Sequence, residues 1–408
     1  MAQRGLLRFV QKLLPARIRH QMIRDAIKIQ SKTPDELEIK LASTKEELES
    51  AFRILQESYE QMGFAKPNES GMRIIKYFAL PTTSIFVAKL GKEVVGTFTI
   101  IRQSPMGLPL EKEFDLQKFQ TQGLRIAEIS SLAIAKAHRA QRGKIFLPVC
   151  KYIVTYCDNY LNLDQMVIAI NPSWKDFYQG YWLFEPLESK KVSHYEFANG
   201  APAVGLHLDL RTYRSRYERT YGHKKPSHNV FNFVFKTHIA ELNFPERIYE
   251  ASMDPVFTPD LLYYFFRQKS DVFEKMVDHE KLALYNLYPN KEYRHVLPDL
   301  NLDEIRSENR YLASPKGLVH AEGMISIIQT LDVSKNGLCL RGNILGLKDF
   351  QLRVQVNSQT EAKLRVERCW VDETTQMCGV KIVESDLNWQ NYINYLEGQF
   401  GQKKMVSA

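Results

Sequence analysis

Residues 84–101 read SIFVAKLGKEVVGTFTII, two apolar runs separated only by Gly91 and Lys92. Both runs are rich in β-branched and aromatic residues, which pack well on the pleated surface of a sheet. Two such runs joined by two residues, one of them glycine, are typical of a β-hairpin. The sequence therefore predicts two antiparallel strands that pair with each other.

Further helices and strands are expected on both sides of this hairpin. Upstream, residues 38–60 predict a strand, a cap at Ser43–Thr44 and an amphipathic helix, with Glu47 and Thr44 forming a capping box. Downstream, we expect a helix near 112–121, a strand at 125–134, a helix at 144–161, a strand at 165–170, a short helix at 176–184 and strands to about 210. This order is typical of a mixed sheet with helices on both faces.

After residue 215 the composition and the pattern of apolar residues change twice. Residues 216–300 are rich in aromatic residues without alternation, which favours a helical extension or bridge, and the Pro-containing acidic stretch at 297–304 predicts a linker. Residues 317–383 alternate apolar and polar with regular turn signals, as in a small all-β barrel. We therefore expect an α+β multidomain protein with an N-terminal segment at 1–33, a first domain at 34–215, the extension at 216–300 and the barrel at 301–400.

Composition narrows the class of protein. The chain has 408 residues, which predicts two or three domains, and 44% apolar with 25% charged residues indicate a globular protein. The five cysteines form no CxxC pair, and no apolar run reaches the roughly 18 residues that span a bilayer. We therefore expect a reduced, cytoplasmic protein. The ten histidines form no HxxxH or HExxH pattern, so we expect no catalytic metal.

The positive charge is concentrated at the N-terminus. Seven cations and one anion in residues 1–30 account for +6 of the net charge of +8, so the rest of the chain lacks the basic footprint of a nucleic-acid-binding protein. Apolar residues recur there every three to four positions, which predicts a basic amphipathic helix. Such a helix either contacts an anionic membrane surface, which would place the protein at the inner membrane, or packs on its own domain.

Several motifs in order resemble a known family. The strings FALPTTSIFVAKLGKEVVGTFTI, GLPLEKEF, AEISSLAI and NPSWKDFYQGYWLFEPL are similar to the N-acyl amino acid synthases of the FeeM type, GNAT-fold relatives of the LuxI-type autoinducer synthases. The resemblance covers roughly residues 35–240. It implies a GNAT-like sheet and transfer of a fatty acyl group from acyl carrier protein to an amino-acid amine. LuxI-type enzymes carry an arginine where Ser131 stands here, which argues against homoserine-lactone synthesis.

The chemistry of acyl transfer suggests roles for particular residues. Glu128 is the candidate base for the acceptor amine, and Tyr178 is the candidate acid for the leaving thiolate. The alternatives are a salt-bridged strand carboxylate and a packed aromatic residue. Backbone amides near Ala133–Ile134 are candidates to polarise the thioester carbonyl.

The segment HRAQRGK at 138–144 lies where a GNAT fold holds its phosphate-binding loop. Arg139, Arg142, Gly143 and Lys144 would hold the phosphopantetheine phosphate or the acidic carrier protein. Three cations at a helix N-terminus oppose the helix dipole, which favours a bound anion over a solvated helix end. The loop has one glycine where the usual GNAT loop has two small residues, so the sequence supports an ordinary acetyl-CoA site less well.

A second pair of motifs lies at the start of the expected barrel. Arg306 and Arg310 form RxxxR, and Asp332, Ser334 and Gly337 form DxSxxG about twenty residues later. Together with the strands LRVERCWVDE and MCGVKIVE and a closing helix, they resemble a PilZ domain, a bacterial receptor for cyclic di-GMP, over residues 303–400.

Each residue of this pair of motifs has a chemical role to offer. Arginines can bind guanine or phosphate, Asp332 can accept from guanine N–H groups, Ser334 can bind a phosphate or cap the turn, and Gly337 would permit a left-handed bend. The alternative is a strand–turn with a polar cap and two linker arginines.

Two functions follow from these motifs. The first is an N-acyltransferase that responds to cyclic di-GMP and uses acyl carrier protein as its donor. The second is a non-catalytic cyclic di-GMP effector whose first domain binds acyl carrier protein, lipid or another protein, because a fold alone does not establish an activity.

Overall fold

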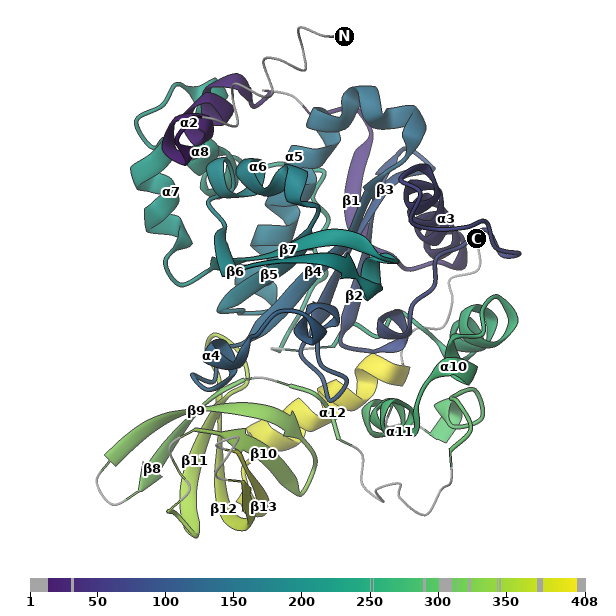
Figure 1. Ribbon diagram of the computed structural model, residues 1–408. Helices are drawn as coiled ribbons and strands as arrows, with labels where there is room; N and C mark the ends of the chain where they lie inside the picture. Colours follow the sequence, from purple (N-terminus) through teal and green to yellow (C-terminus); the bar gives the residue numbers. More distant parts are fainter. Residues whose placement is uncertain are drawn as a thin grey trace, which may run out of the picture.

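The computed structural model describes residues 14–30, 33–249, 251, 253–288, 291–300, 310–313, 315–321, 324–342, 344, 346–372 and 377–401. The first domain is built on a seven-stranded sheet with the order β1-β2-β3-β4-β5-β7-β6 (Figure 1). Its strands are β1 (Leu37–Leu41), β2 (Thr83–Leu90), β3 (Glu93–Arg102), β4 (Ile126–Ile134), β5 (Gln165–Ile170), β6 (Glu185–Tyr195) and β7 (Ala201–Asp209).

The sheet confirms the mixed topology that was expected. The β2–β3 hairpin pairs Val87 with Thr97 and turns at Gly91, whose φ of +59° is a conformation that suits glycine. β4 and β5 run parallel, whereas every other neighbouring pair is antiparallel. A helical connection therefore joins β4 to β5, as parallel neighbours require.

Helices cover both faces of this sheet. On one face, α3 (Lys45–Gln61) buries Phe52 and Leu55. On the other face lie α5 (Arg142–Thr155), followed by a π-helical turn at Tyr156–Tyr160, and then α7 (Tyr213–Tyr221) and α8 (Val230–Phe235). The buried apolar residues accordingly form two clusters separated by the sheet. The helix expected near 112–121 is divided into a 3-10 turn at Pro109–Lys112 and α4 (Gln117–Gln120).

The N-terminal cap of α3 differs in detail from the expected capping box. The backbone N–H of Glu47 donates to the Thr44 hydroxyl at 3.2 Å, as expected. The Glu47 carboxylate, however, accepts from the N–H of Ser43 at 3.0 Å and also contacts Lys89 at 2.9 Å. In a capping box the Glu47 side chain would bond the backbone N–H of Thr44, but here it bonds that of Ser43, one residue earlier. Its contact with Lys89 also links the helix to β2.

The described part of the N-terminal segment packs on its own domain. α2 (Ala16–Ala26) lies against α6 (Lys175–Gly180), where Arg19 makes a two-pronged ion pair with Asp176 at 2.9 and 3.0 Å. Arg24 donates to the carbonyl of Gly180 at 3.1 Å. Residues 16–26 therefore contact their own domain, whereas contact with a membrane surface stays a prediction, and Met1–Leu13 lie outside the described residues. No helix among the residues described is long and apolar enough to span a bilayer.

The extension contains less helix than its composition suggested. After the end of α7 and after α8, its helices are the short α9 (Pro259–Tyr263), α10 (Val272–Lys275) and α11 (Asp278–Leu287), with a π-helical turn at Tyr264–Gln268. A buried polar cluster fixes it to the sheet: Asp254 pairs with Arg247, accepts from Tyr156 at 2.7 Å and lies 3.7 Å from Arg102. The two arginines hold the pKa of Asp254 well below its usual range. The carboxylate is therefore charged, and its contacts join three elements that are distant in sequence.

The C-terminal domain is a closed six-stranded antiparallel barrel with the order β10-β13-β12-β11-β8-β9. Its core contains Leu338, Leu352 and Val366, and α12 (Leu387–Gly401) buries Trp389 and Tyr392. The strands are β8 (Lys316–Ala321), β9 (Met324–Val333), β10 (Gly337–Arg341), β11 (Asp349–Gln355), β12 (Glu361–Asp372) and β13 (Met377–Ser385). The expected all-β module is thus confirmed.

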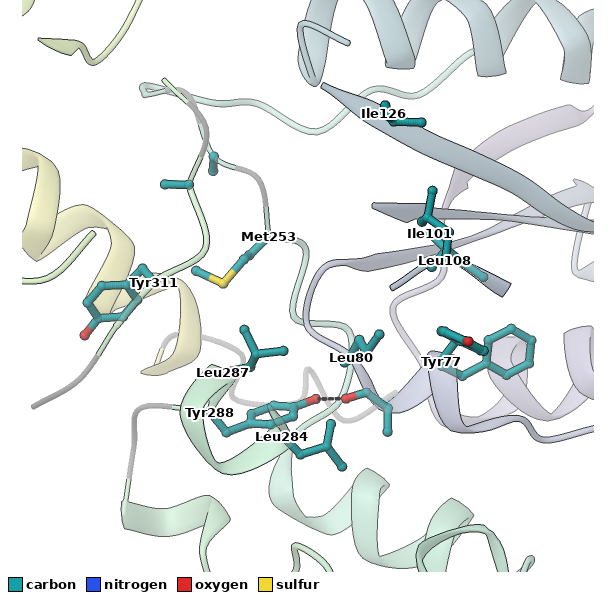
Figure 2. Close-up of a cluster of buried hydrophobic side chains, with 14 of the residues drawn as sticks. Tyr77, Leu80, Ile101, Leu108, Ile126, Met253, Leu284, Leu287, Tyr288 and Tyr311 are labelled. Carbon is teal, nitrogen blue, oxygen red and sulfur yellow. Dashed lines mark hydrogen bonds between the residues drawn. The ribbon is translucent and has the colours of Figure 1, made fainter. Parts of the chain in front are cut away.

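The two domains share one apolar core through the extension. Figure 2 shows Leu80 and Leu108 of the first domain, Leu284 of α11 with Tyr288 directly after that helix, and Tyr311 before the barrel in the same buried cluster. The Tyr288 hydroxyl also donates to the carbonyl of Ala79 at 2.7 Å. Burial of this continuous core stabilises the barrel against the sheet.

Candidate active site

The sheet opens between its two parallel strands. β4 and β5 pair at only three positions, from Ile126↔Gln165 to Glu128↔Val167, although both strands continue beyond them. β4 also carries a bulge, because Thr97 and Thr99 pair with Ala133 and Ser130 and leave two β4 residues opposite Phe98 alone. The bulged Ser131 has a φ of +55°. Bulges bend the strand that carries them, and here the bend lies where β4 leaves β5.

A cavity of about 700 Å³ occupies this opening. Some of its lining residues belong to the α3 face of the sheet, among them Leu55 and Tyr195. Others, such as Ile153 and Met166, belong to the opposite face under α5. The cavity therefore passes through the split sheet and has one branch on each face. Glu128 lies in its wall at the last paired position of the two strands.

Glu128 is a buried carboxyl group in an unusual environment. It is 1% exposed, and its carboxylate accepts a hydrogen bond from the backbone N–H of Leu110 at 2.9 Å. Burial raises the pKa of Glu128 to about 8, and this one hydrogen bond offsets the effect only in part. Within the described parts of the chain no cation lies in ion-pair distance of Glu128, so the structural alternative of a salt-bridged strand carboxylate finds no support there.

Tyr178 lines the same cavity from α6. Its half-buried ring packs edge-on against Phe177 and Phe184, with centroids 5.4 and 5.7 Å away. Two residues earlier on the same helix, Asp176 holds Arg19 of α2. The structure thus brings Tyr178 and Glu128 to one cavity and braces the helix that carries Tyr178.

The backbone of β4 turns polar groups toward the opening. The N–H of Ala135 donates to Val95 in β3 at 2.8 Å. Because backbone groups alternate in direction along a strand, the N–H and C=O of Ile134 point the other way, toward the gap. The carbonyl of Ile134 accepts a 3.3 Å bond from Arg139, which also lines the cavity. The N–H of Ile134 therefore faces the gap, and its role in polarising a thioester carbonyl stays a prediction.

The expected phosphate loop lies at the mouth of the cavity. A 3-10 turn at Lys136–Gln141 leads into α5, and Arg139 and Gly143 are exposed and line the opening. A Cβ placed on Gly143 would meet no atom within 4 Å, so the helix start has free space in front of it. Lys144 is exposed on the next position, and the side chain of Arg142 lies outside the described residues.

Sequence reasoning missed three aromatic residues in the branch under α3. Tyr59 of α3, Tyr195 of β6 and Phe197 of the following turn all line the cavity. Tyr59 lies 136 residues before Tyr195 in the sequence, and the chain has 20 tyrosines. No local pattern distinguishes them.

A second group of candidate residues meets at the start of the barrel. Arg310 donates to Asp332 at 2.6 Å, and the adjacent Tyr311 pairs with Val333 in a β-bridge. Ser334 closes the turn by donating its N–H and hydroxyl to the carbonyl of Gly337 at 2.8 and 3.1 Å. Four of the five predicted residues are therefore brought together. Arg306 lies outside the described residues.

The predicted role of Gly337 was wrong. Its φ does not fall in the left-handed region. A Cβ at this position would instead lie 2.9 Å from the carbonyl oxygen of Val380 in β13. Glycine is needed here because β13 approaches closely, not because the turn bends to the left.

Within the residues that the structure describes, no group of three His, Cys, Asp or Glu side chains is arranged to hold a metal ion. The acyl-transfer chemistry considered below needs none.

Comparisons with known proteins concern the first domain. Solved structures similar to part of this chain include FeeM, an N-acyl amino acid synthase from uncultured soil microbes, at 23% identity over 44% of this chain and 93% of that chain, with a TM-score of 0.37. The AHL synthase LasI is 15% identical over 44% of this chain and 91% of that chain, with a TM-score of 0.32. Spermidine N-acetyltransferase from Vibrio cholerae is also 15% identical, over 44% of this chain and 99% of that chain, with a TM-score of 0.32.

No curated protein matches the sequence. The family model of the N-acyl amino acid synthase FeeM matches residues 50–209, which include α3 from its second turn, all but the first strand of the sheet, and most of the cavity wall. Over this range the chain is similar to FeeM-type synthases, and the match supports an N-acyltransferase.

Proposed function

We propose that this protein transfers a fatty acyl group from the thioester of an acyl carrier protein to the amine of an amino acid, and that cyclic di-GMP regulates the transfer. The observation that carries the proposal is the position of Glu128, a buried carboxyl group in the wall of a cavity that has a branch on each face of the sheet.

The two branches differ in chemistry. Under α5 the lining is apolar and includes Phe146, Ile153, Val154 and Met166, which suits an acyl chain. Under α3 the lining combines aromatic and polar groups, among them Ser58, Tyr59 and Tyr195, which suits an amine with a polar backbone. The thioester carbon would lie where the branches meet, beside Glu128 and the amide of Ile134.

Acyl transfer then needs few groups. The acceptor ammonium gives a proton to Glu128, and the free amine attacks the thioester carbonyl, forming a C–N bond. The amide of Ile134 donates to the developing oxyanion, which stabilises charge that appears only in the transition state. When the C–S bond breaks, Tyr178 protonates the thiolate, and the second proton that the acceptor nitrogen loses as the amide forms returns to Tyr178. Arg139 and the N-terminus of α5 would hold the phosphate of the donor's phosphopantetheine arm at the mouth.

The nucleotide would bind beside Arg310 and Asp332. In the structure the guanidinium of Arg310 and the carboxylate of Asp332 form an ion pair at 2.6 Å, and both side chains are about a quarter exposed. A guanine could take over the carboxylate of Asp332 through its N–H donors and free Arg310 to bind a base edge or a phosphate. The β-bridge between Tyr311 and Val333 keeps the linker arginine next to the turn.

A short connection leads from this turn to Glu128. β9 ends after Asp332 and β10 begins at Gly337, and their cross-strand pair Gln329–Arg341 lies against Gly123 after α4. A Cβ at Gly123 would be 3.7 Å from Gln329 and 3.9 Å from Arg341. The barrel strands therefore touch the loop between β3 and β4.

That same loop supplies the partner of Glu128. Gln120 donates to Glu111 at 3.0 Å, and the neighbouring N–H of Leu110 donates to Glu128 at 2.9 Å. A nucleotide that moves β9 and β10 would move the loop and change the environment of the base. The effect must be reciprocal, because coupling between two ligands is a single free energy.

The experiment is an acyl-transfer assay with purified protein, acyl carrier protein charged with a long-chain fatty acid, and the twenty amino acids, with and without cyclic di-GMP. We expect N-acyl amino acid formation that changes with the nucleotide. A nucleotide affinity that stays unchanged at saturating acyl donor would contradict the coupling, and absence of product with every amine would contradict the transferase.

A further inference from the structure

One tyrosine hydroxyl in the cavity has no hydrogen-bond partner among the described residues. Tyr195, at the end of β6, is 3% exposed, lines the cavity, and has a buried and unpaired hydroxyl. Buried hydroxyls are usually paired, since an unpaired one costs about 1–3 kcal/mol. Burial and the nearby Glu128 raise the pKa of Tyr195. The group is therefore a neutral phenol that can donate a hydrogen bond.

Another buried tyrosine of the same cavity has a hydroxyl that is hydrogen-bonded within the protein. Tyr217 lines the cavity from α7, on the opposite face of the sheet, and is 1% exposed. Its hydroxyl donates to the carbonyl of Trp182 at 2.6 Å. Both tyrosines are thus equally buried, but only the hydroxyl in the branch under α3 lacks a protein partner within the described chain.

A guanidinium without a counter-ion lies next to this branch. Arg73 stacks over the ring of Tyr59 at 4.1 Å and donates to the carbonyl of Phe197 at 2.6 Å. Burial lowers the pKa of Arg73, and among the described side chains no carboxylate lies within 4.0 Å of it. Its two neighbours line the cavity, and the ring of Phe197 lies 5.8 Å from that of Tyr195.

The unpaired donor in the cavity wall and a half-buried cation beside two of the lining residues are complementary to an anion. Their aromatic surroundings suit an organic group rather than a hydrated inorganic ion. The amine must reach Glu128 from this same branch, so the anion belongs to the acceptor. A carboxylate attached near the amine fits both requirements.

We propose that Tyr195 is an acceptor-binding residue whose hydroxyl donates a hydrogen bond to the carboxylate of the amino acid, with Arg73 supplying the neighbouring positive charge. The proposal rests on the acyl transfer proposed above. It predicts selection of amino acids over simple amines, because an amine that lacks the carboxylate leaves the buried donor unpaired.

The kinetic test uses substrate pairs that differ only in the carboxylate: L-phenylalanine with phenethylamine, and L-leucine with 3-methylbutylamine. In Tyr195→Phe we expect the KM for the amino acid to rise tenfold to a hundredfold, as for the loss of a hydrogen bond to a charged group. The KM for the simple amine and for the acyl donor should stay within twofold. Tyr217→Phe, the same chemical change in the other branch, should preserve the preference for the amino acid.

A second measurement does not depend on activity. Without substrate, Tyr195→Phe should keep or raise the melting temperature, because it removes an unpaired hydroxyl, whereas Tyr217→Phe should lower it. At least one of the twenty amino acids should raise the melting temperature of the wild type but not of Tyr195→Phe, and its decarboxylated amine should raise neither.

The outcomes separate the two proposals. If the wild type forms no acyl product but an amino acid stabilises it through Tyr195, the transferase fails and the carboxylate site stands. Suppose that product forms, but that Tyr195→Phe raises the KM for the amino acid and for its decarboxylated amine equally, or raises neither. The carboxylate site is then wrong and the transferase stands. A melting temperature that falls in Tyr195→Phe as much as in Tyr217→Phe would show a structural hydroxyl and overturn the inference.

Discussion

The backbone N–H of Leu110 donates a 2.9 Å hydrogen bond to the carboxylate of Glu128 across 18 residues of sequence. Leu110 lies in the loop between β3 and β4, which also touches the barrel at Gly123, whereas Glu128 lies at the last pair of the split strands. This contact joins the proposed base to the part of the first domain that contacts the barrel.

Glu128→Gln should lower kcat for acyl transfer by a factor of about 10² to 10⁴, the usual contribution of a general base. Glutamine has nearly the same shape, so the variant should fold and keep its affinity for the acyl donor. Rates from product formation and donor binding from calorimetry check this. Loss of donor binding together with activity would point to a structural rather than a chemical role.

The acyl-transfer rate should rise with pH. Burial raises the pKa of Glu128 to about 8, and a base acts only when it is deprotonated. The profile of kcat/KM should therefore increase from pH 6 and level off above about pH 8. A profile already flat at pH 6 would mean that the carboxyl group is ionised throughout and that its environment is more polar than the structure shows.

Stability should depend on pH in the opposite sense. Because the folded pKa of Glu128 lies above the unfolded value, the folded state binds the extra proton, and this group's contribution is lost as pH rises toward 8. Glu128→Gln removes the titration. Its melting temperature relative to the wild type should therefore increase between pH 6 and pH 9, as differential scanning calorimetry can measure.

Most strands of the first domain and of the barrel could be predicted because their signals are local. The β2–β3 hairpin, β5 and the barrel strands have alternating or continuous apolar runs with turn residues between them, and Glu128 is an acid among apolar strand residues. Tyr195 could not be found in this way. Its unpaired hydroxyl depends on β6 lying opposite α3, and nothing in its neighbours along the chain records that arrangement.

The same distinction explains the error at Gly337. The pattern DxSxxG predicts a tight turn, and the structure has one, closed by Ser334. The reason for glycine is the carbonyl of Val380, which lies 43 positions later. Local sequence can show where a glycine is required more easily than why.

Gly337→Ala should destabilise the barrel by about 1–3 kcal/mol, as overpacking of a rigid site does. The added Cβ would lie 2.9 Å from a backbone oxygen, which cannot move without disturbing β13. Urea unfolding followed by fluorescence would measure the change. Gly346→Ala, at a position where a Cβ meets nothing within 4 Å, is the matched control and should change stability by less than about 0.5 kcal/mol.

Arg310→Ala should abolish calorimetric binding of cyclic di-GMP. The variant removes the arginine held beside the turn and leaves Asp332 without its 2.6 Å partner. Arg353→Ala, which removes a half-exposed arginine of β11 at another part of the barrel, should bind as the wild type does. Absence of binding by the wild type itself would mean that the barrel is not a receptor for this nucleotide.

Arg341→Met should separate nucleotide binding from its effect on the acyl site. Methionine keeps the apolar stem beside Gly123 but removes the guanidinium, whose Nε is buried without a partner in the described structure. We expect the affinity for cyclic di-GMP to stay within threefold while the nucleotide's effect on the acyl-transfer rate falls by at least half. If the effect keeps its full size, the barrel acts on Glu128 through the shared core at Tyr288 and Tyr311 instead, and Tyr288→Phe, which loses the 2.7 Å bond to Ala79, becomes the variant that should weaken it.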